Sequence, residues 1–197
     1  MSALANFRDV APLIERAIAA MLLIDQGGSS DSVRAVDANL ARLAKAAALA
    51  KIPVIATGPV IPQIHRYAPH VQYVARDGEI NVWNNPQLVT AVRATQRWQL
   101  IVAGTIADAC VVLPSIAAVH DGYQVFAVMD ACAAEFNFGN AIALARITQA
   151  GVVPTDVATA CAELSVHGFD RNAEPVYRAA LGDDVLPVLA AGLELAP

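Results

Sequence analysis

The sequence predicts a three-layer α/β/α sandwich, in which helices cover both faces of a mostly parallel, doubly wound central sheet of Rossmann-like architecture. Apolar runs of strand length alternate with segments of helical periodicity along the chain. The strand runs are apolar at consecutive positions, which is typical of parallel strands buried on both faces. The 197 residues, of which 56% are hydrophobic and 16% charged, suit one domain over residues 1–197.

The first part of the pattern contains two strands and one helix. The run AMLLID, which ends in a carboxylate, predicts a strand over residues 20–25. Capping residues at 29–32 precede a helix expected over 33–51. The run PVIAT predicts a second strand over 53–57, which ends at Gly58-Pro59. Apolar residues of the helix recur at helical spacing: Val33, Val36, Leu40, Leu43 and Ala47.

Segment 60–83 interrupts the alternation with Pro62, Pro69 and Gly78. We expect a long loop here, with at most one short strand at 71–74. Long loops in compact domains are often functional, so this segment is a candidate for part of a binding site.

The second part of the chain resumes the alternation. Proline in the first turn predicts a helix over 86–96, and Gly151 ends a helix over 140–150. The runs QLIVAG and YQVFAVMD are apolar enough to be buried strands. The remaining predicted elements are strands over 99–104, 123–130 and 152–153, a helix over 108–120 and a helical tail over 164–197.

Composition excludes several classes of partner. The chain has 13 Lys+Arg against 18 Asp+Glu, a net charge of −5, and no basic cluster that would bind a nucleic-acid backbone. The most lipid-like window, 98–119, is interrupted by Gly104, Asp108 and Pro114, so we expect no membrane span. The three cysteines form no CxxC pair, which argues against a disulfide framework. We therefore expect a soluble, cytoplasmic protein.

Ligands of open parallel sheets bind beyond the carboxyl ends of the strands, where the strand order reverses. Asp25 and Cys110 follow two such ends, and they meet if the first strand lies beside strand 99–104. Asp108 is placed to cap the next helix, so Cys110 would lie in its first turn, where the helix dipole favours a thiolate. The alternative is that Cys110 is a small buried hydrophobe, which is what we expect of Cys132 and Cys161.

Three segments resemble the isochorismatase-like cysteine hydrolase superfamily, over roughly residues 21–163. They are LLIDQ at 22–26, GEINVWNN at 78–85 and AGTIADACV at 103–111. The middle segment is similar to the octameric branch of the superfamily, whose substrates are unknown. The resemblance implies an isochorismatase-like fold and a hydrolase that acts on C–N bonds.

The resemblance also implies roles for individual residues. Cys110 would attack an amide-type carbon to form an acyl-enzyme, while Asp25 takes the thiol proton, passes it to the leaving amine and later activates water. A cis peptide between Thr105 and Ile106 would turn the Ile106 amide toward that of Cys110 to form an oxyanion hole. The family's lysine is replaced by Arg76, which keeps the positive charge but does not release a proton at neutral pH.

The substrate pocket would include Gln26, Asn81 and Trp83, although Trp83 is equally suited to anchor a subunit contact. We expect no metal and no cofactor. Nicotinamidases of the superfamily carry Asp-x-His after the second strand, whereas this chain reads Thr57-Gly58-Pro59-Val60.

Three hypotheses for the function remain open. The first is a metal-free cysteine hydrolase that acts on a small molecule through Asp25, Arg76 and Cys110. The second is a catalytically silent relative that acts in binding or assembly, suggested by the missing lysine. The third pairs Cys110 with His65 or His70.

The apolar surplus predicts self-association. The alanine-rich helix and the apolar tail at 185–195 exceed what one small domain needs to bury. We expect a homo-oligomer, either a dimer or a larger assembly up to an octamer.

Overall fold

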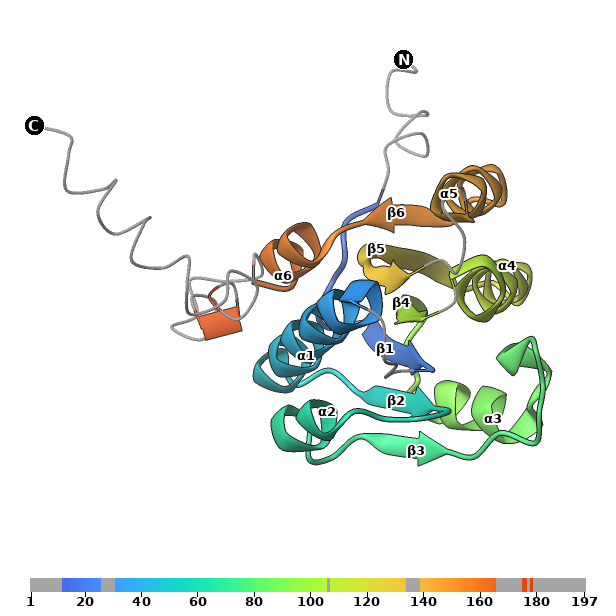
Figure 1. Cartoon of the computed structure of the whole chain (residues 1–197). Coiled ribbons are helices and arrows are strands. Elements are labelled where there is room, and N and C mark those ends of the chain that lie inside the picture. The colour runs from blue at the N-terminus through green and yellow to red at the C-terminus, as the bar shows by residue number, and fades with distance from the viewer. Residues whose placement is uncertain are drawn as a thin grey trace, which may run out of the picture.

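The protein forms one six-stranded parallel sheet with helices on both faces (Figure 1). The computed structural model describes residues 12–25, 31–105, 107–133 and 139–165, together with residues 175, 176 and 178. The sheet order is β3-β2-β1-β4-β5-β6, and every neighbouring pair is parallel. The strands are β1 (Ala19–Ile24), β2 (Val54–Thr57), β3 (Gln72–Val74), β4 (Gln99–Thr105), β5 (Gln124–Ala133) and β6 (Val153–Thr155).

The helices form the outer two layers of the sandwich. Figure 1 shows α1 (Asp31–Ala50), α2 (Pro62–Tyr67) and α6 (Val157–Ser165) on one face of the sheet. The other face carries α3 (Pro86–Ala94), α4 (Val112–His120) and α5 (Gly139–Gln149). The predicted three-layer, doubly wound architecture is therefore confirmed.

The core lies on both sides of β1, the central strand. All six residues of β1 are buried, as are all seven of β4 and all four of β2. In α1 most of the buried side chains are alanines, with Leu40 and Leu43 among them, and Leu40, Leu43, Ala44 and Ala47 are fully enclosed. Small side chains let this helix pack closely on the sheet, which accounts for much of the apolar surplus in the sequence.

The strand order reverses between β1 and β4, and this point brings the predicted site residues together. β1 pairs with β2 on one side and with β4 on the other, with Ile24 opposite both Thr57 and Gly104. The neighbourhood assumed for the first strand and strand 99–104 is thus confirmed. Because all strands are parallel, the residues that follow β1, β2, β3 and β4 lie along one edge of the sheet.

Three local predictions were wrong. Helix α2 occupies part of the expected loop 60–83, with Pro62 in its first turn and Ile64 fully buried. β5 continues beyond residue 130 to Ala133. Asp108 does not cap the helix as expected, because it lies inside a π-helical turn, η3 (Ala107–Val111), and Val111 is the residue at the N-cap of α4.

Other expectations fall on parts of the chain outside the described residues. The predicted tail over 164–197 is described only at the end of α6 and at residues 175, 176 and 178, and the apolar stretch at 185–195 lies outside. None of the helices within the described residues is long and apolar enough to cross a membrane.

Candidate active site

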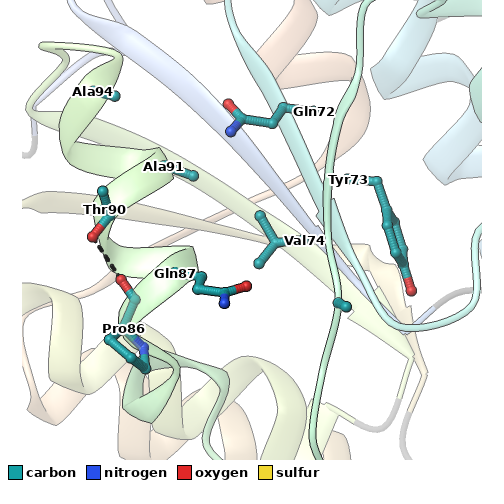
Figure 2. A pocket seen from close by; sticks show the side chains of 9 residues that line it. Gln72, Tyr73, Val74, Pro86, Gln87, Thr90, Ala91 and Ala94 are labelled. Atoms are coloured by element: carbon teal, nitrogen blue, oxygen red, sulfur yellow. Dashed lines mark hydrogen bonds between the residues drawn. The ribbon is translucent and has the colours of Figure 1, made fainter.

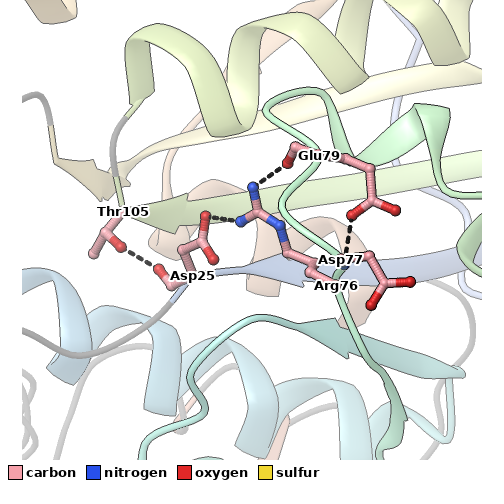
Figure 3. Close-up of polar contacts among 5 residues, drawn as sticks. All are labelled: Asp25, Arg76, Asp77, Glu79 and Thr105. Carbon is pink, nitrogen blue, oxygen red and sulfur yellow. Dashed lines mark hydrogen bonds and ion pairs between the residues drawn. The ribbon is translucent and has the colours of Figure 1, made fainter.

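Asp25 is the first residue after β1, and its backbone is fixed by both neighbouring strands. Its N–H donates to the Thr57 carbonyl at 3.0 Å, and its carbonyl accepts from the Thr105 N–H at 2.9 Å. The Thr105 hydroxyl donates to the same carbonyl (Figure 3). Asp25 has φ +42°, a conformation that aspartate tolerates better than most residues. The left-handed turn ends the strand, so the carboxylate lies at the edge of the sheet.

Two glycines leave space around Asp25, one for its carboxylate and one for the backbone of Ile24 before it. Gly58 follows β2 at φ +77°, and a Cβ there would lie 2.0 Å from Oδ1 of Asp25. Gly104 lies opposite Ile24, and a Cβ there would lie 1.9 Å from the Ile24 carbonyl oxygen. Both positions therefore require glycine for space, and Gly58 also requires it for its conformation.

Arg76 comes after β3 and reaches across the carboxyl ends of β2 and β1 to Asp25. Its Nη1 donates to Oδ2 of Asp25, and its Nη2 donates to the Glu79 carbonyl (Figure 3). The side chains of Arg76 and Asp25 are 17% and 16% exposed, so the ion pair is largely shielded from solvent. Burial acts to lower the pKa of Arg76, but the hydrogen bond and charge of Asp25 and the charge of Cys110 outweigh it, and the pKa is raised. Arg76 is therefore a permanent cation next to Asp25.

Cys110 lies in η3, after β4, and its side chain is only 6% exposed. Burial, followed by the hydrogen bond and negative charge of Asp25, raises the pKa of Cys110 to about 11, while Arg76 acts in the opposite direction. The expectation of a thiolate stabilised at a helix start is thus wrong, because burial and Asp25 outweigh the positive groups. Cys110 is a neutral thiol at neutral pH, next to a carboxylate that can accept its proton.

The other two cysteines are packing residues, as the sequence predicts. Burial raises the pKa of Cys132 and of Cys161 to about 12. Cys132 donates from Sγ to the Val128 carbonyl at 3.1 Å, and the Cys161 side chain is fully buried in α6.

The predicted pocket residues Asn81 and Trp83 have structural contacts. Oδ1 of Asn81 accepts from the Trp83 N–H at 3.0 Å and caps the short helix η2 (Val82–Asn84). Trp83 is 8% exposed, and its Nε1 donates to Oδ2 of Asp121 at 3.0 Å. Its ring packs edge-on against that of Tyr123, with 5.5 Å between the ring centroids. Asp121 follows the end of α4, whereas Cys110 precedes its start. The indole therefore anchors its loop at the end of α4 remote from Cys110.

Several predicted features fall on residues outside the described part of the chain. Gln26, expected in the pocket, and Ile106, expected in the oxyanion hole, are both among them. The predicted cis peptide between Thr105 and Ile106 involves the same position and so stays a prediction.

An open groove of about 700 Å³ borders the loop that carries Arg76. It lies between β3 and α3, and its walls include Gln72, Tyr73, Val74, Gln87 and Thr90 (Figure 2). Ala75, the residue before Arg76, also lines it. The groove lies beside β3, the outermost strand of the sheet, whereas Cys110 follows β4, two strands further in than β2.

The hypothesis that pairs Cys110 with a histidine is wrong. His65 is exposed on α2. His70 is exposed just before the amino end of β3, whereas Cys110 comes after the carboxyl end of β4. The carboxylate that acts on the pKa of Cys110 is that of Asp25. Within the described residues, no three His, Cys, Asp or Glu side chains come together in a way that could hold a metal ion.

Sequence reasoning missed two residues that bind Arg76 or the residue before it, Glu79 and Asn85. The backbone carbonyl of Glu79 accepts a hydrogen bond from Arg76, and a backbone contact of this kind cannot be predicted from residue types. Asn85 is 5% exposed and accepts from the Gln87 and Leu88 N–H groups at 2.9 and 3.2 Å. An asparagine directly before Pro86 is a recognisable helix cap, so this part of its role could have been found.

Comparisons with known proteins show which family this chain resembles and which solved structures share its fold. Residues 58–159 match the isochorismatase domain family. The probable hydrolase YcaC of Escherichia coli is 35% identical over 147 residues, which cover 68% of this chain and 71% of that protein. A structure of YcaC from Pseudomonas aeruginosa, with hexane-2,5-diol and covalent acrylamide, has a TM-score of 0.79 at 28% identity. The E. coli YcaC structure, described as an octameric hydrolase of unknown specificity, has a TM-score of 0.79 at 26% identity. Each of the two structural alignments covers 93% of this chain and 98% of the other.

Proposed function

We propose that this chain, which belongs to the isochorismatase family of hydrolases, is a metal-independent cysteine hydrolase. The proposed reaction is cleavage of a C–N bond in a small amide- or carbamoyl-type molecule. The observation that carries the proposal is the convergence of Asp25, Arg76 and Cys110 at the carboxyl edge of the sheet. Arg76 is bonded to Asp25, and the pKa of Cys110 responds to both charges. Three groups from three separate segments of the chain form one acid–base and nucleophile unit.

In the first half of the reaction, Asp25 accepts the proton of the Cys110 thiol while sulfur attacks the carbonyl carbon of the substrate. The carbonyl π electrons move to oxygen, and the backbone amides of Cys110 and Ile106 are proposed to stabilise that oxyanion. The oxyanion then re-forms the carbonyl, the C–N bond breaks, and Asp25 returns the proton to the departing nitrogen. The product is a thioester on Cys110.

The second half of the reaction uses the same carboxylate. Asp25 takes a proton from water as the water oxygen attacks the thioester carbon. The C–S bond then breaks, and Asp25 returns the proton to the Cys110 sulfur. The acid product leaves with the oxygen of that water, and the enzyme regains its neutral thiol.

Arg76 is proposed to act as a fixed charge and not as a proton relay. Its raised pKa keeps it protonated throughout, and its charge stabilises Asp25 before proton transfer and the Cys110 thiolate after it. Independence from metal is supported by the donor groups at the end of β2, because residues 57–60 offer neither a carboxylate nor an imidazole.

The proposal is tested by trapping the thioester. Purified protein would be incubated with a panel of small amides, carbamoyl compounds and imides. Product release would be measured, and acid-quenched samples would be searched by mass spectrometry for an acyl adduct on the Cys110 peptide. We expect both signals for at least one compound, and neither from Cys110→Ala.

Cys161→Ala is the matched control, because Cys161 is a buried thiol of α6 outside the proposed machinery. It should behave like the wild type. Hydrolysis that survives in Cys110→Ala, or an adduct confined to another residue, would overturn the assignment. A wild-type protein that hydrolyses nothing in the panel and carries no adduct would favour the silent binding or assembly role instead.

We further propose that the protein assembles into a homo-oligomer. Support comes from the octameric state given for E. coli YcaC and from exposed apolar side chains, including Ile80 in the loop before η2 at 68% and Ile142 in α5 at 61% exposure. Light scattering on a gel-filtration column should give a mass that is a multiple of the 20.6 kDa chain. A peak at the mass of one chain at micromolar concentration would contradict this.

A further inference from the structure

The loop that carries Arg76 is closed by one buried asparagine. Asn85 comes at the far end of the loop, and its Nδ2 donates to the carbonyl of Ala75 at 3.0 Å. Ala75 directly precedes Arg76, so the contact fixes the backbone at the position from which the arginine side chain extends. Because Asn85 is 5% exposed, no water competes freely for this hydrogen bond.

A second contact ties the loop to the guanidinium itself. Nη2 of Arg76 donates to the Glu79 carbonyl, and the Glu79 carboxylate accepts from the Asp77 N–H at 2.9 Å. These bonds shape the turn that follows Arg76, whereas Asn85 anchors the residue before it. The arginine is thus fixed from both sides along the chain.

The two ends of the Asn85 amide have separate tasks. Oδ1 caps α3 by accepting from Gln87 and Leu88, a task that serine, threonine or aspartate performs as well. The donation to Ala75 requires an amide N–H on a side chain of this length, and among the usual capping residues only asparagine supplies it. A cap alone would therefore not require asparagine at this position.

We propose that Asn85 is a positioning residue, which holds the start of the loop through Ala75 so that the Arg76 guanidinium lies on Asp25 and beside Cys110. This inference rests on the proposed function, because it assigns Asn85 a role in placing one of the three proposed catalytic groups. Asn85 acts through Arg76 and touches none of the reacting atoms.

The test removes the donor and keeps the cap. Asn85→Ser retains a capping oxygen but cannot reach Ala75, and exposed Asn84 provides the matched control Asn84→Ser. The readout is the pH dependence of Cys110 alkylation by iodoacetamide, followed on the isolated Cys110 peptide. Since the charge of Arg76 lowers the pKa of Cys110, displacing it should raise that pKa. We expect alkylation near neutral pH to slow about tenfold, equivalent to roughly one pKa unit.

A double variant separates positioning from a general structural effect. In an Arg76→Gln background no charge remains to be placed, so Asn85→Ser should cause no further change in the pKa of Cys110. An unshifted pKa in Asn85→Ser, or an equal shift in both backgrounds, would overturn the proposal. If Asn85→Ser does not fold, Asn85→Thr carries the same expectation, because threonine also caps and fills more of the space.

The alkylation measurement needs no substrate, so the two proposals fail separately. A protein that hydrolyses nothing but shows the shift retains Asn85 as the residue that positions Arg76. A protein that forms the thioester but shows no shift retains the hydrolase and loses the role of Asn85.

Discussion

Replacing Asp25 with asparagine should slow hydrolysis about a thousandfold, the scale of a lost general base, and at the same time make Cys110 more acidic. Asparagine keeps the shape of the side chain but can neither accept the thiol proton nor carry a negative charge. The hydrogen bond and the charge of Asp25 both raise the pKa of Cys110, which stands at about 11. Without them the pKa of Cys110 falls, because burial is then the one remaining cause that raises it.

The two effects have opposite signs, which makes the prediction specific. At a fixed pH of about 8, each unit by which the pKa falls increases the thiolate fraction about tenfold, so iodoacetamide should modify Cys110 faster in Asp25→Asn than in the wild type. Hydrolysis of the same preparation should be slower. Loss of the fold would also expose the buried thiol and speed alkylation, so the comparison uses Asp25→Asn protein whose unfolding transition matches that of the wild type.

The measurement compares pH profiles of alkylation and hydrolysis for wild type, Asp25→Asn and Asp77→Asn. Asp77 is an exposed carboxylate on the loop that carries Arg76, so its variant controls for loss of one negative charge. It should match the wild type in both profiles. An Asp25→Asn protein that hydrolyses at the wild-type rate, or whose Cys110 pKa rises, would contradict the proposed role of Asp25.

The raised pKa of Cys110 means that slow alkylation of this residue has two explanations. From the sequence, a catalytic Cys110 is expected to be a poised thiolate that alkylates readily at neutral pH. With a pKa near 11, slow alkylation is also what a functional thiol next to a carboxylate base would show. A slow reaction therefore does not identify a silent relative, whereas the response of the pKa to Asp25→Asn and Arg76→Gln reports whether the charges act on the thiol.

Strand-level features were predictable because they depend on residue type and order. The continuous apolar runs place β1 and β4 in the buried centre, and the rule for parallel sheets then places Asp25 and Cys110 at one edge. Arg76 was foreseen only through the resemblance to the isochorismatase-like hydrolases, because it stands where that family has a lysine. Helix α2 was missed because its six residues, PQIHRY, include only one that is fully buried, which is too little to show helical periodicity.

The protonation state of Cys110 and the contacts of Trp83 could not be read from local patterns. The first is a balance between burial, the negative charge of Asp25 and the positive charge of Arg76, and the two charged groups come from segments far from Cys110 in the sequence. The second depends on Asp121 and Tyr123, which follow Trp83 by about forty positions in the chain and form its surroundings only after folding. Both are properties of tertiary structure, which overrides local preferences.

Gly104→Ala should be the most destabilising single substitution in the sheet, because it places a methyl group into the backbone of the neighbouring strand. The added Cβ would lie 1.9 Å from the carbonyl oxygen of Ile24 and 2.8 Å from its carbonyl carbon. No side-chain rotation relieves a contact with backbone, so β1 and β4 would have to separate where they pair. We expect a loss of about 4 kcal/mol or more, at the severe end of single substitutions.

The control for this substitution is Gly151→Ala, at a glycine of φ +85° with no atom within 4 Å of the added Cβ. Its cost should be limited to the left-handed backbone, about 1–2 kcal/mol. Chemical denaturation of both variants measures the difference, and a Gly104→Ala protein as stable as Gly151→Ala would contradict the steric argument.

Ile24 and Gly104 directly precede Asp25 and Thr105, whose backbones are hydrogen-bonded to each other. Any folded fraction of Gly104→Ala should therefore also hydrolyse more slowly, since the strand separation that admits the methyl group displaces the Asp25 carboxylate from Arg76 and Cys110.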